Sequence, residues 1–223
     1  MQPKSTVFAA RNMVRKALKG ALATRDEVTG VPYASMILLA TTVSGDPLSI
    51  VSRLARHTQN LLASSAASIL IDTSNAQGDA ASGGRISLQG RFTKDISVSA
   101  RSRFLARHAG ARAYADFADF AIMRLEIENA HLIEGFGRIV SLSGDKLRAP
   151  LADDTGFQEA EADALAALRL CWPEVTGLDA EGVDLIVGGS SQRLPFPTAA
   201  SDMQQARKAA ANCLATRGDV ASA

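Results

Sequence analysis

The stretch from Tyr33 to Leu62 constrains the fold of this chain more than any other. An apolar run from Tyr33 to Thr42 is followed by the turn Ser44-Gly45-Asp46-Pro47 and by a second apolar run that ends near Ser52. Two apolar runs around a short turn are typical of two adjacent antiparallel strands. The chain then becomes polar and cationic before a short helical pattern from His57 to Ser64.

The polar loop after the second predicted strand is a candidate anion-binding site. Its hydroxyls and cations are Ser52, Arg53, Arg56, His57 and Thr58. Backbone N–H groups at the start of a helix have no partner within the helix, and the helix dipole favours negative charge there. The loop is therefore suited to a phosphate. A solvent-exposed Ser52, a surface His57 or a capping Thr58 would give the same sequence, so the structural reading stays open beside the functional one.

Elements on both sides of this stretch complete a pattern of about six to seven strands. The sequence predicts helices over 5–22, 97–109 and 111–117, and further strands near 22–24 and over 67–72, 85–93, 120–127 and 131–142. The predicted loop 73–84 is polar, and Gly90 suggests a β-bulge. Because helices do not separate every strand pair, the pattern favours a mainly antiparallel β-barrel with peripheral helices over a doubly wound sheet.

The C-terminal part has a different pattern. A polar linker over 144–154 precedes a helix that begins at a Thr155–Gln158 capping box and ends at Trp172-Pro173. A hairpin follows around 188–191, and a second capping box at Ser201–Gln204 begins the last helix. An α-β-β-α unit of about 70 residues is small to fold alone, so we expect it to pack on the barrel. The predicted domains are 1–145 and 146–223.

Composition excludes several partners. The net charge is +1 and 5% of the residues are aromatic, so neither a basic field nor a stacking platform for nucleic acid is expected. No apolar run approaches the ~20 residues of a membrane span, and the first residues lack a signal-peptide pattern. Cys171 and Cys213 form no disulfide or metal-ligand spacing. We therefore expect a cytoplasmic protein with no bound metal ion, no membrane and no nucleic-acid partner.

Common catalytic motifs are also missing. The sequence contains no Gly-x-Ser-x-Gly elbow, Walker loop or His-Glu-x-x-His motif. Its three histidines are His57, His108 and His131. We interpret His108, at a predicted helix end, and His131, at a predicted strand start, as structural residues. The residues alone do not establish whether the chain is an enzyme.

Several short motifs, taken in order, resemble a known superfamily. They are Pro32-Tyr33-Ala34-Ser35, the segment Ser52 to Leu61, Leu88-Gln89-Gly90-Arg91, Phe117-Ala118-Asp119-Phe120 and Gly135-Phe136-Gly137-Arg138. Over roughly residues 10–145 the chain resembles the pyridoxamine-phosphate-oxidase-like FMN-binding split barrels, and within them the haem-utilisation (HugZ-type) branch. The resemblance implies an antiparallel split β-barrel and a homodimer with flavin between the two subunits.

The resemblance also implies positions for an FMN cofactor. The phosphate-binding cations of the superfamily fall at Ser35 and Ala40 and at His57 and Thr58, with Ser52 beside the phosphate or ribityl chain. Arg85 falls near the flavin ring, although an edge-strand arginine would look the same. Most of the superfamily's cations are thus replaced, and Arg53, Arg56 and His57 are the residues that could compensate.

The haem-utilisation branch supplies the alternative. Relatives in that branch often have histidines at the first helix of the C-terminal unit, whereas this chain reads Gly156-Phe157-Gln158 there and has no histidine after His131. Two hypotheses stay open. In the first, the chain is an FMN-dependent oxidoreductase or FMN-binding protein, and the cofactor is surrounded by Ser35, Ser52, His57, Thr58 and Arg85. In the second, it is a haem- or partner-binding protein that has lost flavin. An absorbance spectrum of the purified protein distinguishes them.

Overall fold

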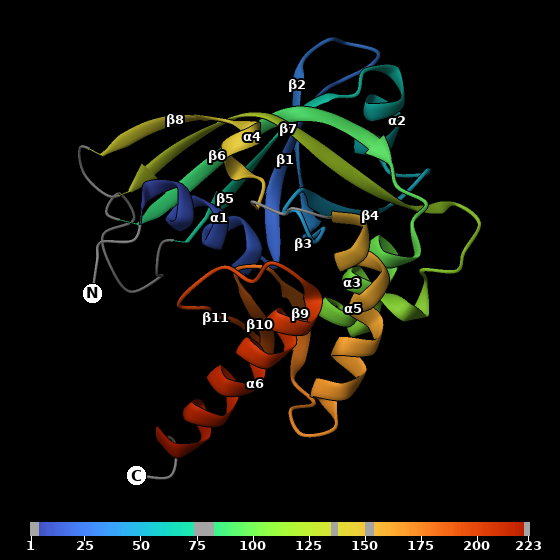
Figure 1. Ribbon diagram of the computed structural model, residues 1–223. Helices are drawn as coiled ribbons and strands as arrows, with labels where there is room; N and C mark the ends of the chain where they lie inside the picture. The colour runs from blue at the N-terminus through green and yellow to red at the C-terminus, as the bar shows by residue number, and fades with distance from the viewer. Residues whose placement is uncertain (1–4, 74–82, 135–137, 150–153, 221–223) are drawn as a thin grey trace.

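The chain folds into a large β-sheet with peripheral helices and a smaller sheet with two helices (Figure 1). The structure is a computed structural model that describes residues 5–73, 83–134, 138–149 and 154–220. Helix α1 (Thr6–Lys16) lies between the two sheets and contacts both of them. None of the helices in the described ranges is both long and apolar enough to span a bilayer.

The large sheet is antiparallel throughout and follows the order β2-β1-β5-β6-β7-β4-β3, with β8 added beside β7. Its strands are β1 (Lys19–Arg25), β2 (Pro32–Leu38), β3 (Ala40–Thr41), β4 (Pro47–Ser52), β5 (Ala66–Asp72), β6 (Gly84–Lys94), β7 (Phe120–Glu134) and β8 (Ile139–Ser143). The antiparallel split β-barrel predicted from the sequence is confirmed.

Strict alternation along the strands decides which face of this sheet is buried. Strand β1 alternates exposed and buried residues from end to end. One row across the sheet pairs Leu22 with Ile69, Ile69 with Leu88 and Leu88 with Ala130, and all four are buried. Ala10 and Val14 of α1 pack into the same core. These four residues, and those two positions away from them along each strand, therefore face the barrel interior, and the residues between them face outward.

Gly90 forms the predicted bulge. The pairing register between β6 and β7 shifts between Gln89 and Gly90, and a Cβ at Gly90 would collide with the carbonyl oxygen of Glu126. Because glycine has no Cβ, the two strands approach closely here and the sheet can bend.

Two predicted elements have different boundaries in the structure. The first helix ends at Lys16, not at residue 22, because Lys19 to Arg25 pair with β2 along their whole length. The boundaries of the strands predicted over 120–127 and 131–142 are wrong, because the observed strands are Phe120–Glu134 and Ile139–Ser143. Strand β7 continues through Glu128 and Asn129, and both side chains are exposed because the register with β6 shifts at this point. The predicted Gly135-Phe136-Gly137 lies outside the described residues.

The central hairpin is shorter than predicted. Gly45 has the positive φ of +111° that the predicted turn requires. However, β3 pairs with β4 through only two residue pairs, while β2 pairs with β1 and β4 pairs with β7. The apolar run from Tyr33 to Thr42 is therefore two strands, because the barrel changes pairing partner at Leu39.

The predicted helices form with smaller corrections. They are α2 (Arg56–Ala63), α3 (Val98–Arg107) and the 3₁₀ turn η1 (Ala109–Ala113), and a helix that was not predicted, α4 (Gly144–Leu147), follows β8. In α3, Val98 is 80% exposed, whereas Phe104 is fully buried and holds the helix against the barrel core. The predicted linker begins as helix α4, packed on β7, and residues 150–153 lie outside the described ranges. Most of the predicted loop 73–84 also lies outside them.

The C-terminal unit contains one strand more than predicted. Helices α5 (Asp154–Arg169) and α6 (Met203–Val220) accompany the sheet β9 (Val175–Asp179), β10 (Gly182–Val187) and β11 (Ser190–Pro195). The hairpin at Gly188 and Gly189 forms as predicted, with positive φ at both glycines. The capping residue of α6 is Asp202, which accepts from the Gln205 N–H at 2.8 Å, one residue later than predicted.

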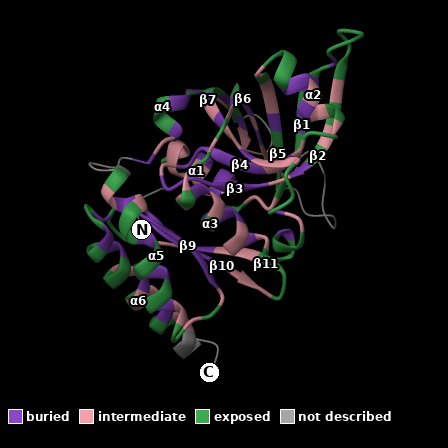
Figure 2. Ribbon diagram, turned by 90° about the vertical axis from the view of Figure 1, so that its right-hand side faces the viewer, coloured by how far each residue is buried: buried purple, intermediate pink, exposed green. Residues whose placement is uncertain are grey.

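A buried cluster of charges joins this unit to α1 and α3. Arg193 donates to Asp179 and to Asp184 at 2.8–2.9 Å, and Arg103 pairs with Glu161. Arg107 of α3 donates to the Arg15 carbonyl at 2.6 Å and to Ser191 Oγ at 2.8 Å. The apolar core of the unit lies between the small sheet and the helices α5 and α6. The outer surfaces of these two helices are exposed (Figure 2). The contact between the two units is therefore strongly ionic.

Candidate functional site

The predicted phosphate loop connects β4 to α2 at the barrel surface. Ser52 Oγ donates to Asp119 Oδ2, and the Arg53 N–H donates to the Asp119 carbonyl at 2.7 Å. The side chain of Arg53 is exposed. A carboxylate thus lies beside Ser52, where the resemblance implied the phosphate, and it would repel an anion there.

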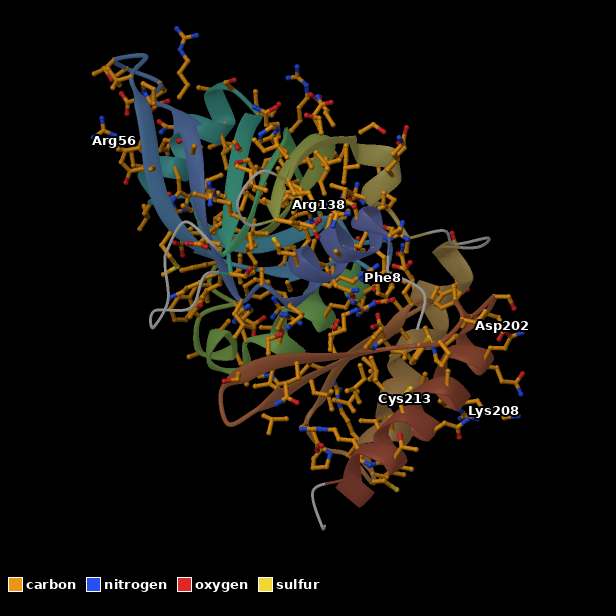
Figure 3. All side chains as sticks on the ribbon, turned by 90° about the vertical axis from the view of Figure 1, so that its left-hand side faces the viewer. Phe8, Arg56, Arg138, Asp202, Lys208 and Cys213 are labelled. Atoms are coloured by element: carbon orange, nitrogen blue, oxygen red, sulfur yellow. The ribbon has the colours of Figure 1, made fainter. Side chains whose placement is uncertain are left out.

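Arg56 is bound to a carboxylate of the β1–β2 turn. Its Nε lies 2.7 Å from Asp26 Oδ2, and its guanidinium lies 5.5 Å from the centre of the Tyr33 ring. The hydrogen bond from Arg56 holds the pKa of Asp26 well below its usual range. Arg56 lies at the end of the barrel remote from α6 (Figure 3). Its charge is therefore compensated within the protein.

Ser35 and His57 are brought together as predicted. Ser35 Oγ lies 3.1 Å from His57 Nδ1. Partial burial lowers the pKa of His57, so its imidazole is neutral at neutral pH. His57 therefore offers a hydrogen-bonding ring at this site and not the cation that could compensate for the missing arginine and lysine.

The start of α2 nevertheless retains unused hydrogen-bonding groups. Its N-cap is Ala55, which has no capping side chain, and its first turn contains no acidic residue. The N–H groups of Arg56 and His57 make no hydrogen bond within the described chain. Thr58 is 5% exposed, and its Oγ1 has no partner among the described residues. The helix start thus fits an anion by its amides and hydroxyl, although the nearby arginines do not add to it.

Arg85 is separated from this loop. It lies on β6 opposite Asp72 of β5 and opposite Ile133 of β7. Its neighbour Ile86 is buried, so Arg85 faces outward, whereas Ser35 pairs with the buried Leu22 and faces the opposite side of the sheet. The seven predicted residues therefore do not form one site.

The outward face that bears Arg85 also exposes apolar side chains that were not predicted from the sequence. In one row, Met36 pairs with Ala21, Ala21 with Leu70 and Leu70 with Ser87. Met36 and Leu70 are 63% and 41% exposed. Together with Ala21 and Ala34 they line a shallow hollow of about 430 Å³. Exposed apolar side chains gathered on one face mark a contact surface.

The same face continues to β8. The row extends from Ser87 to His131 and from His131 to Ser141, and the adjacent row contains Ile133 and Ile139. The alternation of β7, with Ala130 and Leu132 inward, was the signal that could have placed His131 outward.

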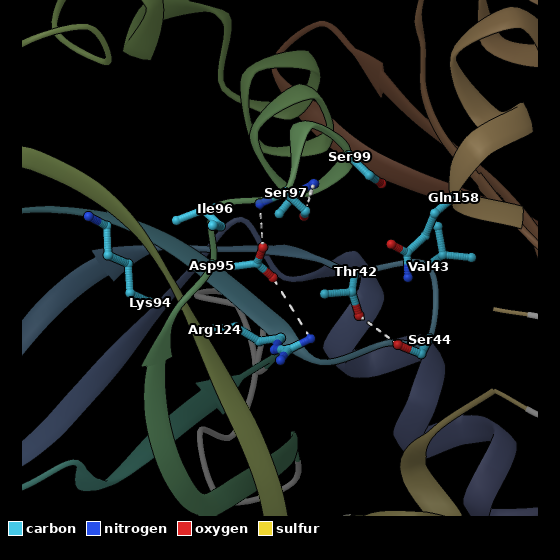
Figure 4. Close-up of a pocket in the computed structure, with 11 residues that line it drawn as sticks. Thr42, Val43, Ser44, Lys94, Asp95, Ile96, Ser97, Ser99, Arg124 and Gln158 are labelled. Atoms are coloured by element: carbon cyan, nitrogen blue, oxygen red, sulfur yellow. Dashed lines mark hydrogen bonds and ion pairs between the residues drawn. The ribbon is translucent and has the colours of Figure 1, made fainter. Parts of the chain in front are cut away.

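A polar pocket lies at the junction of β7, the start of α3 and α5 (Figure 4). Its volume is about 270 Å³. Asp95 Oδ1 accepts from the Ser97 N–H at 2.9 Å, and Asp95 Oδ2 lies 3.8 Å from Arg124, which also pairs with Glu126 at 3.3 Å. The cation of Arg124 is therefore balanced by two carboxylates. No cluster of three or more metal-ligating side chains occurs in the described ranges.

The geometry thus defines a split barrel with an open apolar sheet face. Residues 2–146 match the family model described as CREG, beta-barrel. The chain belongs to this family.

One curated relative is the chloroplastic non-canonical haem oxygenase HOZ of Arabidopsis thaliana, 30% identical over 166 residues. The match covers 73% of this chain and 49% of that protein, so the chain spans about half the length of this relative.

Solved structures confirm the fold. A protein of unknown function from Agrobacterium tumefaciens is 24% identical, with a TM-score of 0.80 over 95% of this chain and 96% of that one. A haem-binding protein from Mycobacterium smegmatis is 24% identical, with a TM-score of 0.62 over 98% and 100% of the two chains. The predicted split-barrel superfamily, with haem-utilisation proteins among its relatives, is confirmed.

Proposed function

We propose that this chain is a haem-binding protein that acts as a homodimer. The observation that carries the proposal is the open outer face of the large sheet, on which Met36, Leu70 and Ile139 are exposed. A porphyrin is planar and apolar with carboxylates at one edge. An uncovered apolar sheet face fits the planar apolar ring. The names of the Arabidopsis and Mycobacterium relatives support haem as the ligand.

A second copy of the chain is the proposed partner. Haem on an open sheet face would leave one side of its ring in water, and the same face of a second barrel would cover it. A two-fold pairing would also bury the small side chains Ala21 and Ala34 of both subunits. Cys171 and Cys213 are unpaired, which fits the proposed cytoplasmic location. We retain 1–145 and 146–223 as the proposed domains.

FMN is the second candidate ligand. The observation that favours it is the start of α2, where the amides of Arg56 and His57 and the buried Thr58 hydroxyl have no partner among the residues that the structure describes. In that case Ser35, Ser52, Arg53 and Arg85 would complete the site, and any redox chemistry would come from the flavin. The Asp119 carboxylate beside Ser52 and the neutral His57 weigh against it.

Titration of the purified protein with haemin and with FMN tests both candidates. We expect a saturable shift of the haem Soret band, and a mass by light scattering of twice the 23.4 kDa chain. Leu70→Glu should weaken haemin binding, because it places a charge on the outer face. Leu170→Glu is the matched control, since Leu170 is 86% exposed on the C-terminal unit. Saturable FMN binding that is lost in the Arg53→Ala/His57→Ala variant, without haemin binding, would contradict the proposal.

A further inference from the structure

The three histidines have different surroundings. His108 Nε2 lies 2.8 Å from the Leu39 carbonyl, and its ring packs 4.9 Å from the Phe104 ring. His57 is half-buried and lies against Ser35. His131 is exposed on β7, and its Nδ1 lies 3.3 Å from Ser141 Oγ. Of these three rings, His131 is thus the one that presents its imidazole to the open face of the sheet.

The contact with Ser141 determines which nitrogen of His131 is available. When Nδ1–H donates to Ser141 Oγ, the Nε2 lone pair is unprotonated and points away from β8. Nε2 makes no hydrogen bond to any described residue. A hydrogen bond at one ring nitrogen that leaves the other for a metal is the arrangement of metal-ligating histidines generally.

The side chains around His131 suit an apolar macrocycle. Ser87 lies opposite His131, and Leu70 lies one strand further in the same row. Adjacent strands are about 4.8 Å apart, so Leu70 is about 10 Å from His131 across the sheet. Along β7, Ile133 lies two residues from His131 and pairs with Ile139, which is 61% exposed, while the polar pair Gln89 and Asn129 lies on the remaining side. A planar ring centred at His131 would therefore lie on small and aliphatic side chains towards Leu70 and towards Ile139.

We propose that His131 Nε2 is the protein ligand of the haem iron, with Ser141 as the residue that positions its ring. This inference rests on the proposed haem-binding function and adds the ligand residue to it. It assigns a new role to a histidine that the sequence reading interpreted as structural. It also accounts for the absence of any histidine after residue 131, because iron ligation then needs none in the C-terminal unit.

Haemin titration of His131→Ala tests this inference, with His108→Gln as the matched control, because His108 has a structural contact with the Leu39 carbonyl. We expect His131→Ala to lose the spectrum of histidine-ligated ferric haem and to bind haemin more than tenfold more weakly, whereas His108→Gln keeps both. Added imidazole should restore the spectrum of His131→Ala. Ser141→Ala should weaken binding by about tenfold, the lower end of the range for residues that orient a metal ligand.

The possible failures are distinguishable. If the wild-type chain binds haemin and His131→Ala keeps the histidine-ligated spectrum, the ligand assignment is wrong and the haem-binding function stands. If the wild-type chain does not bind haemin, the proposed function and the ligand assignment both fall. Circular dichroism of each variant shows that its fold is retained, as expected for a change at an exposed strand position.

Discussion

Arg15 Nη1, near the end of α1, lies 2.8 Å from Asp179 Oδ2 at the end of β9. The two side chains are 1% and 0% exposed, so the pair is fully buried. Arg193 shares the same carboxylate from the opposite side. The barrel and the C-terminal unit, whose apolar cores are distinct, are thus joined by ions that have no access to water.

Removing one member of this pair should be costly. Arg15→Met leaves Asp179 with less compensation for its burial, and breaking a buried pair typically destabilises by about 3–5 kcal/mol. Urea unfolding, followed by circular dichroism and by the fluorescence of Trp172, measures the change. Arg91→Gln is the control, because Arg91 and Glu128 form an exposed pair worth no more than about 1 kcal/mol. Equal effects of the two substitutions would contradict the structural role of the buried pair.

A methyl group at Gly144 should also destabilise the fold. Its Cβ would collide with the backbone carbonyl of Ile127, and backbone atoms cannot move aside as a side-chain end can. We expect Gly144→Ala to lower the free energy of unfolding by at least the roughly 1–3 kcal/mol typical of overpacking. At Gly110 no atom lies within 4 Å of an added Cβ, so Gly110→Ala should be close to neutral. Thermal unfolding of both variants makes the comparison.

Thr58→Val distinguishes a structural hydroxyl from a ligand-binding one. Because Thr58 Oγ1 is buried without a partner, replacing it by a methyl group should leave the stability of the unliganded chain unchanged or raise it. If FMN binds at the start of α2, the same variant should lose flavin affinity. A clear loss of stability without ligand would show that the hydroxyl has a partner in solution.

The stability of the fold should fall in mild acid. Burial lowers the pKa of His108 below its ordinary 6.5, so the unfolded chain takes up a proton before the folded chain does. The free energy of unfolding should therefore be constant above about pH 7.5 and decrease as the pH falls through 6.5 and below. His108→Gln, which retains a donor for the Leu39 carbonyl, should reduce this decrease. His131→Gln is the matched control, and an equal reduction there would contradict the assignment.

Local pattern was sufficient to predict most of the barrel. The alternation around Ile86 and Leu88 predicted β6 and its inward face, Gly90 predicted the bulge, and Ser97 predicted the start of α3. Strand alternation, glycine bulges and helix caps are all determined by residues that are close together in the sequence. The break expected at Glu128 was wrong because a long strand with polar outward positions resembles a turn in sequence.

The site was harder to predict because its partners are distant in sequence. Arg56 donates to Asp26, which is 30 residues away in the sequence, and Ser52 donates to Asp119, which is 67 residues away. No periodicity reveals such pairs. The open face that contains Met36, Leu70 and His131 arises from six strands whose order in the sheet differs from their order in the chain. The alternation of each strand predicts which of its residues face outward, but it does not predict which strands lie beside it in the sheet.

Methyl NMR with paramagnetic manganese protoporphyrin IX shows whether haem lies on the outer face of the large sheet. If it does, the methyl signals of Met36, Leu70, Ile133 and Ile139 broaden on titration, while those of Leu54 and Leu62 beside the α2 loop, and of Leu170 on the C-terminal unit, remain sharp. Broadening confined to Leu54 and Leu62, with the sheet-face methyl groups unchanged, would contradict it.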